Sequence, residues 1–465
     1  MEDFYPSNLV ESAKSQILVI FIESHGLIKF KYKRDIISFV QKVQKDLSPI
    51  AVIGLGYVGL PILLAASEHF ACVGFDINDS RVQELKIGID RNNDIDEIDF
   101  QKINPLFTSK SEDLAGCKTF IITLPTPLGQ NFQPDISILK SGIELISPFI
   151  KPGSLIIFES TVYPGCTEDI CIPLIENLSN LKSGKDFGVA FSPERINPGD
   201  KVHSFKNIDK VVSGIDNNSI EKAVLLYETI IQANIFKAAS IRVAEMSKVL
   251  ENTQRDVNIA LMNEISIICS KLGVSIHDVL DAANTKWNFL NFTPGLVGGH
   301  CIGIDPYYLA FSAAAVQHNP DIILTSRRIN ENYIDFLLSL IISNLIKKQI
   351  QPSSILVLGG TFKENCSDIR NSKALEFCIK LSSLYGEIHL LDPHISTLPE
   401  FYKNISLNPK NLKNQNFDVI ISLVKHNEFL QRGFSHYEEL LSSKGLIFDF
   451  RNFFPSFTSE KLIKL

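Results

Sequence analysis

A cysteine in a glycine-rich stretch is the strongest chemical signal in this chain. The stretch reads GLVGGHCIGIDPYY over residues 295–308, and it places Cys301 four residues before Asp305. A thiolate is a strong nucleophile where nearby cations depress its pKa, but a thiol can also serve as a small buried residue in a turn. Spacing alone leaves both interpretations open. We read the adjacent His300 as structural, because neighbouring side chains in an extended loop point apart.

Carboxylates, a lysine and an amide could assist such a thiol. The stretch FSPERINPGD holds Glu194 and Arg195 between two prolines, which stiffen a loop. Glu245, Lys248 and Asn252 follow helical spacing and therefore share one face of a predicted helix. Both groups are ordinary if they are solvated. If the helix is buried between domains, its lysine and amide would instead face a cleft.

A second site begins with a glycine pattern. Gly54, Gly56 and Gly59 form G-x-G-x-x-G directly after the apolar run IAVI. In a strand–turn–helix context the first glycine permits the tight turn, the second admits a pyrophosphate, and the third lets the helix pack on the sheet. The helix N-terminus would then face the phosphates with its partial positive charge. This pattern predicts a dinucleotide-binding loop.

Polar residues at later strand ends refine that prediction. Asp76 ends the next predicted strand, where a carboxylate accepts from ribose hydroxyls and repels a 2′-phosphate, so NAD is favoured over NADP. Arg81 weakens this preference for NAD, because an arginine can bind the 2′-phosphate of NADP. Thr126 in LPTP and Thr161 in ESTV also follow apolar runs. Each threonine could bind ligand at the carboxyl edge of a sheet, or simply cap a helix.

The elements that would position these residues alternate along the chain. Apolar runs at 120–124, 155–158 and 189–191 predict a parallel, doubly wound sheet. A second alternating unit begins near Ser354 with ILVLGG, followed by EIHLLDP, FDVIISLV and KGLIFDF. Between the units, a long helix is predicted by one apolar stripe. The stripe comprises Val243, Met246, Leu250, Val257, Leu261, Ile265 and Ile268.

Composition excludes several classes of protein. The 465 residues carry a net charge of −7, so no global basic field favours nucleic acid. The eight cysteines form no CxxC pair and no zinc-finger spacing with histidine, so we expect no metal site and reduced thiols in a cytoplasmic protein. The apolar run 17–22 is too short to span a membrane, which takes about 20 residues. It predicts a strand-like piece, and the spacing of Ile36, Val40, Val43 and Leu47 predicts an amphipathic helix after it.

Taken together, the motifs resemble the UDP-glucose/GDP-mannose dehydrogenase family. Seven stretches carry the resemblance in order: VIGLGYVGLP, LPTP, ESTVYPG, SPERINPGD, AEMSKVLENTQRDVNIALMNE, FTPGLVGGHCIGIDPYYL and TFKENCSDIRNS. The fourth and sixth resemble the branch that oxidises UDP-N-acetylhexosamines for surface polysaccharides such as capsule and O-antigen. Ile304 stands where the UDP-glucose branch has a lysine, which disfavours UDP-glucose.

The resemblance implies a four-electron oxidation of the sugar C6 alcohol to a carboxylate with two NAD⁺. Cys301 would form a thiohemiacetal and then a thioester, which water hydrolyses. Lys248 and Asn252 would stabilise the oxyanion, Asp305 and Thr126 would position a proton-shuttling water, and Glu194 would act as base or orient that water.

The resemblance also implies the binding residues. Those for NAD are Gly54, Gly56, Tyr57, Val58, Gly59, Asp76, Arg81, Thr126, Thr161 and Arg370. Those for the substrate are Glu194, Arg195, Lys248, Asn252, Phe292, Gly295, Gly298 and Lys363. The glycines at 295, 298 and 299 would let the backbone close around a sugar.

The predicted fold is α/β, with two Rossmann-like doubly wound domains joined by a long central helix and a helical dimerisation region. We expect an N-terminal extension over 1–48, an NAD-binding domain over 49–236, a central helical domain with the cysteine loop over 237–340, and a UDP-sugar-binding domain over 341–465. A homodimer or higher homo-oligomer with no membrane span is expected.

UDP-N-acetylglucosamine is the expected substrate. UDP-N-acetylgalactosamine, UDP-N-acetylmannosamine and UDP-glucose are alternatives that the sequence leaves open, and so is a nucleotide-sugar dehydrogenase that removes a single hydride. A non-catalytic nucleotide-sugar-binding protein is a further alternative. The number of NADH molecules formed per sugar separates them, because a single-hydride enzyme needs no cysteine.

Overall fold

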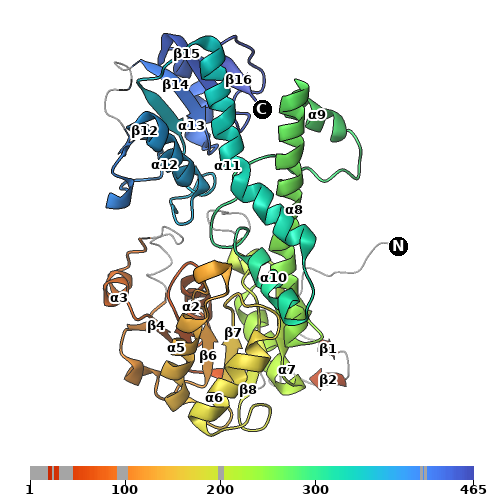
Figure 1. The fold of residues 1–465 in the computed structure, drawn as a ribbon. Coiled ribbons are helices and arrows are strands. Elements are labelled where there is room, and N and C mark those ends of the chain that lie inside the picture. The colour runs from red at the N-terminus through yellow and green to blue at the C-terminus, as the bar shows by residue number, and fades with distance from the viewer. Residues whose placement is uncertain are drawn as a thin grey trace, which may run out of the picture.

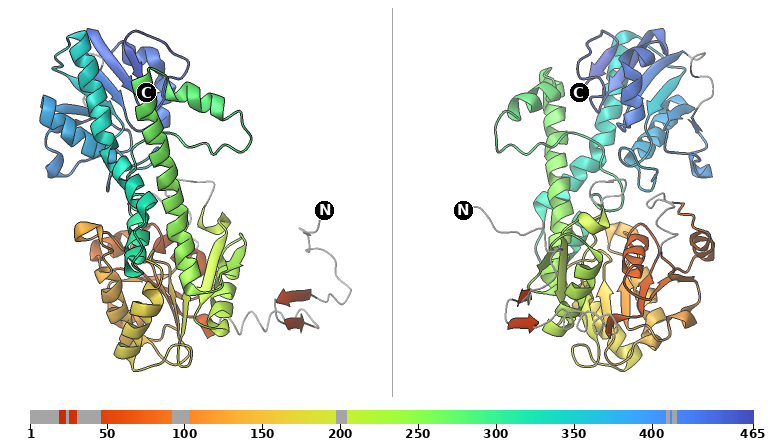
Figure 2. Two further views of the ribbon diagram at one scale, coloured as in Figure 1. Left: turned by 45° about the vertical axis from the view of Figure 1, so that its right-hand side comes forward. Right: turned by 180° about the vertical axis from the view of Figure 1, so that it is seen from behind.

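Two α/β domains lie at opposite ends of the molecule, and two long helices run between them (Figure 1). The structure is a computed structural model that describes residues 19–23, 26–30, 46–91, 103–196, 204–408, 412 and 416–465. Figure 2 shows the same division from two other directions. The expected fold class, with two Rossmann-like domains and a helical middle, is confirmed.

The first domain is built on a twisted sheet whose order is β10-β9-β8-β7-β6-β3-β4-β5 in the described residues. Its central strands are short apolar runs that are buried throughout, as expected where helices cover both faces of a parallel sheet. The edge departs from the expected pattern, because β9 pairs antiparallel with β8. In spatial order the strands are β10 (Ile235–Lys237), β9 (Lys210–Gly214), β8 (Gly188–Phe191), β7 (Leu155–Phe158), β6 (Thr119–Ile122), β3 (Ile50–Ile53), β4 (Cys72–Phe75) and β5 (Leu106–Thr108).

Helices cover both faces of this sheet, and two hydrophobic clusters fill the space on either side of it. The helices are α2 (Gly59–Ser67), α3 (Asp79–Lys86), α5 (Ser137–Ile146), α6 (Ile172–Ser179) and α7 (Asn217–Ile230). Short helical turns are η1 (Ser111–Leu114), η2 (Gln130–Phe132), η3 (Ser147–Phe149), η4 (Thr167–Cys171) and η5 (Phe205–Asn207).

The central helices are α8 (Ile241–Leu272), α9 (Ile276–Ala283), α10 (Asp305–Ala315) and α11 (Asp321–Lys348). The predicted long helix is therefore present as α8, which packs against α10 and α11. Its buried contacts with α11 include polar ones: Asp256 lies 2.6 Å from Arg327, and Asn263 donates to Asn330 over 2.9 Å.

The apolar stripe of α8 faces outwards, in contrast to what an isolated amphipathic helix would do. Met246 is 41% exposed and Leu250 is 53% exposed, whereas Lys248 and Asn252 are only 8% and 5% exposed. The polar face is buried because it supplies the contacts to α10, α11 and the first domain. Most of the stripe is therefore left without cover within one chain, although Ile265 packs against the core.

The second domain carries a parallel sheet in the order β13-β12-β11-β14-β15-β16. The strands are β13 (Ile405–Leu407), β12 (Ile388–Leu391), β11 (Ile355–Leu358), β14 (Phe417–Ser422), β15 (Leu441–Asp449) and β16 (Leu462–Lys464). Helices α12 (Lys373–Tyr385) and α13 (Asn427–Glu438) and the turn η6 (Glu400–Tyr402) flank it. The four apolar runs expected here as strands are β11, β12, β14 and β15.

Near the N-terminus, β1 (Val19–Glu23) pairs antiparallel with β2 (Gly26–Phe30), in agreement with the expected strand-like piece. The amphipathic helix expected over residues 36–47 lies almost wholly outside the described residues. Among the described helices, none has the length and the apolar character needed to cross a membrane.

Candidate functional site

A cleft of about 1600 Å³ opens between the two domains and is lined from all three parts of the chain. It collects many of the residues predicted as functional. Those that line it are Tyr57, Arg195, Lys248, Asn252, Gly298, Cys301, Lys363 and Arg370. The structure therefore brings the predicted thiol, lysine and amide together with the lysine of the second domain.

The glycine loop has the geometry of a dinucleotide cradle. Gly54 has a φ of +96°, which favours glycine, and a Cβ on Gly59 would lie 1.9 Å from the Gly54 carbonyl oxygen. A Cβ on Gly56 would meet nothing within 4 Å, so open space lies over the loop. No side chain caps α2 after Val58. Open space beside an uncapped helix N-terminus fits a pyrophosphate.

Asp76 lies at the end of β4, beside that loop. One carboxylate oxygen accepts from the Leu55 amide over 2.8 Å, and the other accepts from the Asn78 amide over 2.9 Å. The half-exposed carboxylate keeps lone pairs for ribose hydroxyls, because each oxygen can accept twice. Arg81 is buried, with its Nε donating to the Leu55 carbonyl over 3.1 Å and its guanidinium 2.7 Å from Asp90. Arg81 therefore lies under the loop, and its predicted contact with NAD stays a prediction.

The two predicted threonines meet each other. Thr126 donates its hydroxyl to the Thr161 carbonyl over 2.5 Å, and the Tyr308 hydroxyl donates to the Thr126 carbonyl. These bonds join the loops after β6 and β7 to helix α10. Thr126 therefore keeps only acceptor capacity for the predicted water.

Glu194 belongs to a buried ionic cluster. Its carboxylate accepts from the amides of Arg195 and Ile196, and it lies 3.3 Å from the Lys210 ammonium. Lys210 also lies 2.5 Å from Glu159. Burial raises the pKa of Glu159 to about 7, although the ammonium acts in the opposite direction. The predicted base thus faces Lys210 rather than the cleft, and its role in hydrolysis stays a prediction.

Asp305 is held at the start of α10 by the polar face of α8. Asn252 donates its amide to the Asp305 carboxylate over 2.6 Å, and both residues are buried. Burial raises the pKa of Asp305 to about 6, and the Lys248 ammonium and the Asn252 hydrogen bond oppose this shift. A carboxyl group with that pKa can exchange a proton near neutral pH.

Cys301 lies beside this carboxylate, and its carbonyl accepts from the Asp305 amide over 2.9 Å. Burial and the Asp305 charge raise the pKa of the thiol above its ordinary value. Lys248, Tyr57 and Arg255 lower it, but by less. The expectation that cations depress this pKa is therefore only partly met, and the thiol is protonated in this state.

The cysteine loop packs on the second domain. A Cβ on Gly295 would lie 2.1 Å from the Arg451 guanidinium, and one on Gly298 would lie 2.5 Å from the Asn371 carbonyl oxygen. The Gly299 amide donates to that same carbonyl over 3.2 Å. These glycines were expected to close around a sugar. The structure shows that they let two loops of the protein approach each other, and their predicted contact with the sugar stays a prediction.

The remaining predicted binding residues divide between cleft and core. Lys363 and Arg370 line the cleft, and Arg370 lies 2.7 Å from Asp368. Phe292 packs on the core of the second domain. His300, which we read as structural, lies 3.4 Å from Asp368. This pair links the cysteine loop to the second domain, but His300 also lines the cleft, so its structural role stays a prediction.

Arg255 and Arg451 are among the cleft residues that sequence reasoning missed. Arg255 lines the cleft one turn beyond Asn252, and the i, i+3 spacing in the same helix could have found it. Arg451 donates to the Pro294 carbonyl over 2.6 Å and to Glu364 over 2.8 Å. No local pattern signals Arg451, because its partners lie far away in the sequence. No cluster of His, Cys, Asp and Glu in the described part of the chain could hold a metal ion.

Comparison with known proteins agrees with this geometry. Three models of the UDP-glucose/GDP-mannose dehydrogenase family match the chain: the NAD binding domain over residues 48–231, the central domain over 242–332 and the UDP binding domain over 356–456. NAD is therefore the cofactor of the first domain, and the open loop over Gly56 fits it.

Similar proteins match over most of their length. Protein CapL of Staphylococcus aureus is 44% identical over 88% of this chain and 96% of its own. UDP-N-acetyl-D-glucosamine 6-dehydrogenases of Pseudomonas aeruginosa and Salmonella typhi are each 42% identical over 88% of this chain and 97% of their own. The solved structure of a UDP-D-ManNAc dehydrogenase from Pyrococcus horikoshii is 32% identical and has a TM-score of 0.80, covering 89% of this chain and 98% of its own. The chain therefore belongs to the UDP-glucose/GDP-mannose dehydrogenase family.

Proposed function

We propose that this protein oxidises the C6 hydroxyl of a UDP-N-acetylhexosamine, with UDP-N-acetylglucosamine the favoured substrate, to the uronic acid for surface polysaccharide synthesis. The observation that carries the proposal is the position of Cys301 in a cleft shared by an NAD-binding domain and a UDP-binding domain. Bound NAD⁺ accepts a hydride in each of the two oxidation steps.

Cys301 and the residues around it carry out the remaining chemical steps. The thiol adds to the aldehyde-level carbon and gives a thiohemiacetal, which loses a second hydride and becomes a thioester. Water then hydrolyses the thioester, which releases the uronic acid and returns the thiol. Lys248 lies on the cleft and places its ammonium where negative charge develops on the sugar oxygen. Asp305 takes the thiol proton, since its pKa of about 6 leaves it ionised at neutral pH.

Two observations favour an acetamido sugar. The relatives from Pseudomonas aeruginosa and Salmonella typhi are both UDP-N-acetyl-D-glucosamine 6-dehydrogenases. Ile304, which replaces the lysine of the UDP-glucose branch, is buried in an apolar cluster with Val249 and Tyr308. A lysine at this position would place its stem and ammonium in an apolar cluster, so the surroundings of the cysteine loop suit the isoleucine.

NADH release over four UDP-sugars tests the proposal. UDP-N-acetylglucosamine should give two NADH per molecule of uronic acid, and it should react faster than UDP-N-acetylgalactosamine, UDP-N-acetylmannosamine and UDP-glucose. One NADH per sugar would select the single-hydride alternative. Binding of a UDP-sugar without NADH release would select the non-catalytic alternative.

We further propose that the exposed stripe of α8 is covered by a second copy of this chain. Leu250 and Leu261 are each about half exposed on this stripe, and an apolar surface of this length marks a protein interface. The stripe carries no charge that would select an unlike partner, so a self-complementary two-fold contact suits it. The wild-type chain should sediment as a dimer or larger, and Leu250→Lys with Leu261→Lys should give monomers. A wild-type monomer would exclude the interface.

A further inference from the structure

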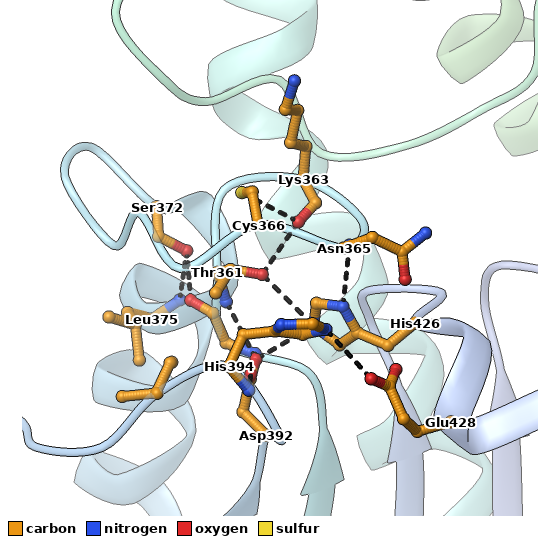
Figure 3. A network of polar contacts seen from close by, with 12 residues as sticks. Thr361, Lys363, Asn365, Cys366, Ser372, Leu375, Asp392, His394, His426 and Glu428 are labelled. Atoms are coloured by element: carbon orange, nitrogen blue, oxygen red, sulfur yellow. Dashed lines mark hydrogen bonds and ion pairs between the residues drawn. The ribbon is translucent and has the colours of Figure 1, made fainter. Parts of the chain in front are cut away.

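The loop that carries Lys363 is held from inside the second domain. It follows β11 and lines the cleft with Lys363. Figure 3 shows the Lys363 side chain pointing away from the polar network beneath it. The Lys363 carbonyl points the other way and accepts from the Thr361 hydroxyl over 2.8 Å and from the Cys366 thiol over 3.4 Å. These two bonds fix the backbone of Lys363, and with it the direction of the side chain.

A buried histidine closes the loop. The backbone amide of Asn365 donates to Nδ1 of His426 over 2.9 Å. The backbone amide of Asn427 donates to the Asn365 side-chain oxygen over 3.0 Å. Asn365 has a φ of +54°, in the left-handed region that side chains disfavour. Asparagine adopts this region more readily than most residues, and the two hydrogen bonds with the start of α13 hold the loop in this conformation.

The hydrogen bonds assign the protonation state of His426. A backbone amide can only donate, so Nδ1 must offer its lone pair and the ring proton must lie on Nε2. Nε2 lies 3.1 Å from Asp392 and 3.2 Å from the Thr361 hydroxyl oxygen, which accepts because its own proton goes to Lys363. The ring is thus neutral and fully buried, and every polar atom on it has a partner.

Asp392 completes the anchor. It accepts from the amides of Gly360 and Thr361 as well as from His426. These three hydrogen bonds favour the ionised form of the carboxylate. Asp392 therefore stays ionised and orients Nε2–H, which leaves Nδ1 free to receive the loop.

We propose that His426, as the neutral Nε2–H tautomer, is a positioning residue that directs the Lys363 ammonium toward the diphosphate of the bound nucleotide sugar. A lysine ammonium is a strong partner for phosphate when its direction is fixed beforehand. His426 itself does not line the cleft, so it acts through the loop. The identity of the ligand rests on the proposed function, but the tautomer and the hold on the loop do not.

Two substitutions separate the two ends of the imidazole. In His426→Asn the side-chain oxygen stands near the place of Nδ1 and can still accept from the Asn365 amide. In His426→Gln the amide reaches the place of Nε2 and can still donate to Asp392, but the acceptor for Asn365 is lost. His389→Gln is the matched control, because that ring lies half-buried on β12 and packs on Phe417.

The expected result is a split between KM and kcat. His426→Gln should raise the KM for the UDP-sugar, and the calorimetric Kd for UDP, by about tenfold, with kcat and the KM for NAD changed less than about threefold. His426→Asn should stay within about threefold in all four values, and His389→Gln should match the wild type. Imidazole ¹⁵N spectra of the wild type, assigned with His426→Asn, should show a proton on Nε2 alone.

Three results would overturn the inference. A proton on Nδ1 contradicts the assigned tautomer, and this measurement stands even if His426→Gln does not fold. An unchanged KM and Kd in a folded His426→Gln variant contradicts the role in positioning. Equal losses in the Asn and Gln variants, accompanied by equal losses of Tm, show a purely structural histidine. If the wild type oxidises no UDP-sugar but UDP binding still weakens only in His426→Gln, the proposed function fails and this inference holds.

Discussion

The two Rossmann-like domains turn the chain in the same way after their first strands. Gly54 follows β3 with a φ of +96°, and Gly359 follows β11 with a φ of +89°. The amide of each glycine donates to the last residue of the neighbouring strand, over 2.8 Å in the first domain and 2.9 Å in the second. The same backbone turn therefore opens both loops.

The aspartates that follow the neighbouring strands also match. Asp76 accepts from the amide of Leu55 over 2.8 Å, and Asp392 accepts from the amide of Gly360 over 2.7 Å. In both domains the second carboxylate oxygen accepts from the amide two residues further along the chain. In dinucleotide-binding domains, the acidic residue at this position hydrogen-bonds the ribose. Both domains of this protein have an aspartate there.

The difference lies at one residue after the turn. Gly56 leaves open space in the first domain, whereas Thr361 at the corresponding position is fully buried and bonded to Lys363 and near His426. Asp76 is half-exposed, but Asp392 is fully buried beneath His426. The same scaffold therefore forms a cofactor cradle where the space is empty, and a loop anchor where protein fills it.

The largest expected effect tests Cys301, which lies in the cleft between the two domains. Cys301→Ser should lower uronic acid formation by about 1000-fold or more, because a serine ester cannot replace the thioester route at this site. Calorimetry should give unchanged Kd values for NAD and UDP, since the two halves bind them separately. If Cys301→Ser still forms two NADH per sugar at the wild-type rate, the covalent mechanism is wrong.

The buried cluster of the first domain, which is ionic, contrasts with the neutral His426 of the second. Lys210→Met should reduce the free energy of unfolding by about 3–5 kcal/mol, because Glu159 and Glu194 lose the cation they share. Since the folded-state pKa of Glu159 is raised to about 7, its contribution to stability falls as pH rises toward that value. The loss in Lys210→Met should therefore be larger at pH 8 than at pH 5.

Denaturant unfolding at these two pH values measures this loss. Lys237→Met is the control, because its ion pair with Glu221 is exposed and should contribute less than about 1 kcal/mol. Equal effects of the two substitutions would show that the cluster does not stabilise the domain.

Gly56→Thr gives the first domain the residue type that the second domain has at the corresponding position, Thr361. The KM for NAD should rise by about 100-fold, because the side chain enters the space that fits the pyrophosphate. Thermal stability should change little, since a Cβ there meets nothing within 4 Å. The KM for the UDP-sugar should not change. An unchanged KM for NAD would show that the open space over Gly56 is not the cofactor site.

The smallest expected effect is the pH dependence that Asp305 imposes on kcat/KM. Because the pKa of Asp305 is about 6 and the carboxylate is the form that accepts a proton, kcat/KM should rise with pH through this value. The fall between about pH 7 and about pH 5 should approach tenfold. Asp305→Asn should be slower and should lack this acid limb. An acid limb that survives the substitution belongs to another group.

Much of this architecture follows from local sequence. The apolar runs became the central strands of both sheets, and the glycine pattern became the loop before α2. Local sequence also predicted α8 as a helix, but it left open which of its faces the rest of the protein covers. Periodicity measures the separation of polar and apolar faces, and it does not tell which one the rest of the protein covers. Here the polar face of α8 carries the site, so it is buried with Lys248 and Asn252.

Contacts between distant residues lay beyond sequence reasoning. Lys210 meets Glu159 from 51 residues away, and Arg451 meets Pro294 from 157 residues away. The residues next to Lys210 and Arg451 in the sequence do not indicate such distant partners. The pKa of Cys301 was also out of reach, because it depends on a balance between burial, Asp305 and Lys248 that only the fold determines.

The exposure of the cysteines makes Cys301 the most accessible thiol for labelling. Seven of the eight thiols are buried, and Cys301 alone is half-buried on the cleft. Since alkylating reagents react with the thiolate and the pKa of Cys301 is raised, labelling should be slow at neutral pH and faster in alkaline buffer. One equivalent of reagent should therefore mark the junction of the two domains, where a fluorophore would report on ligands arriving from either side.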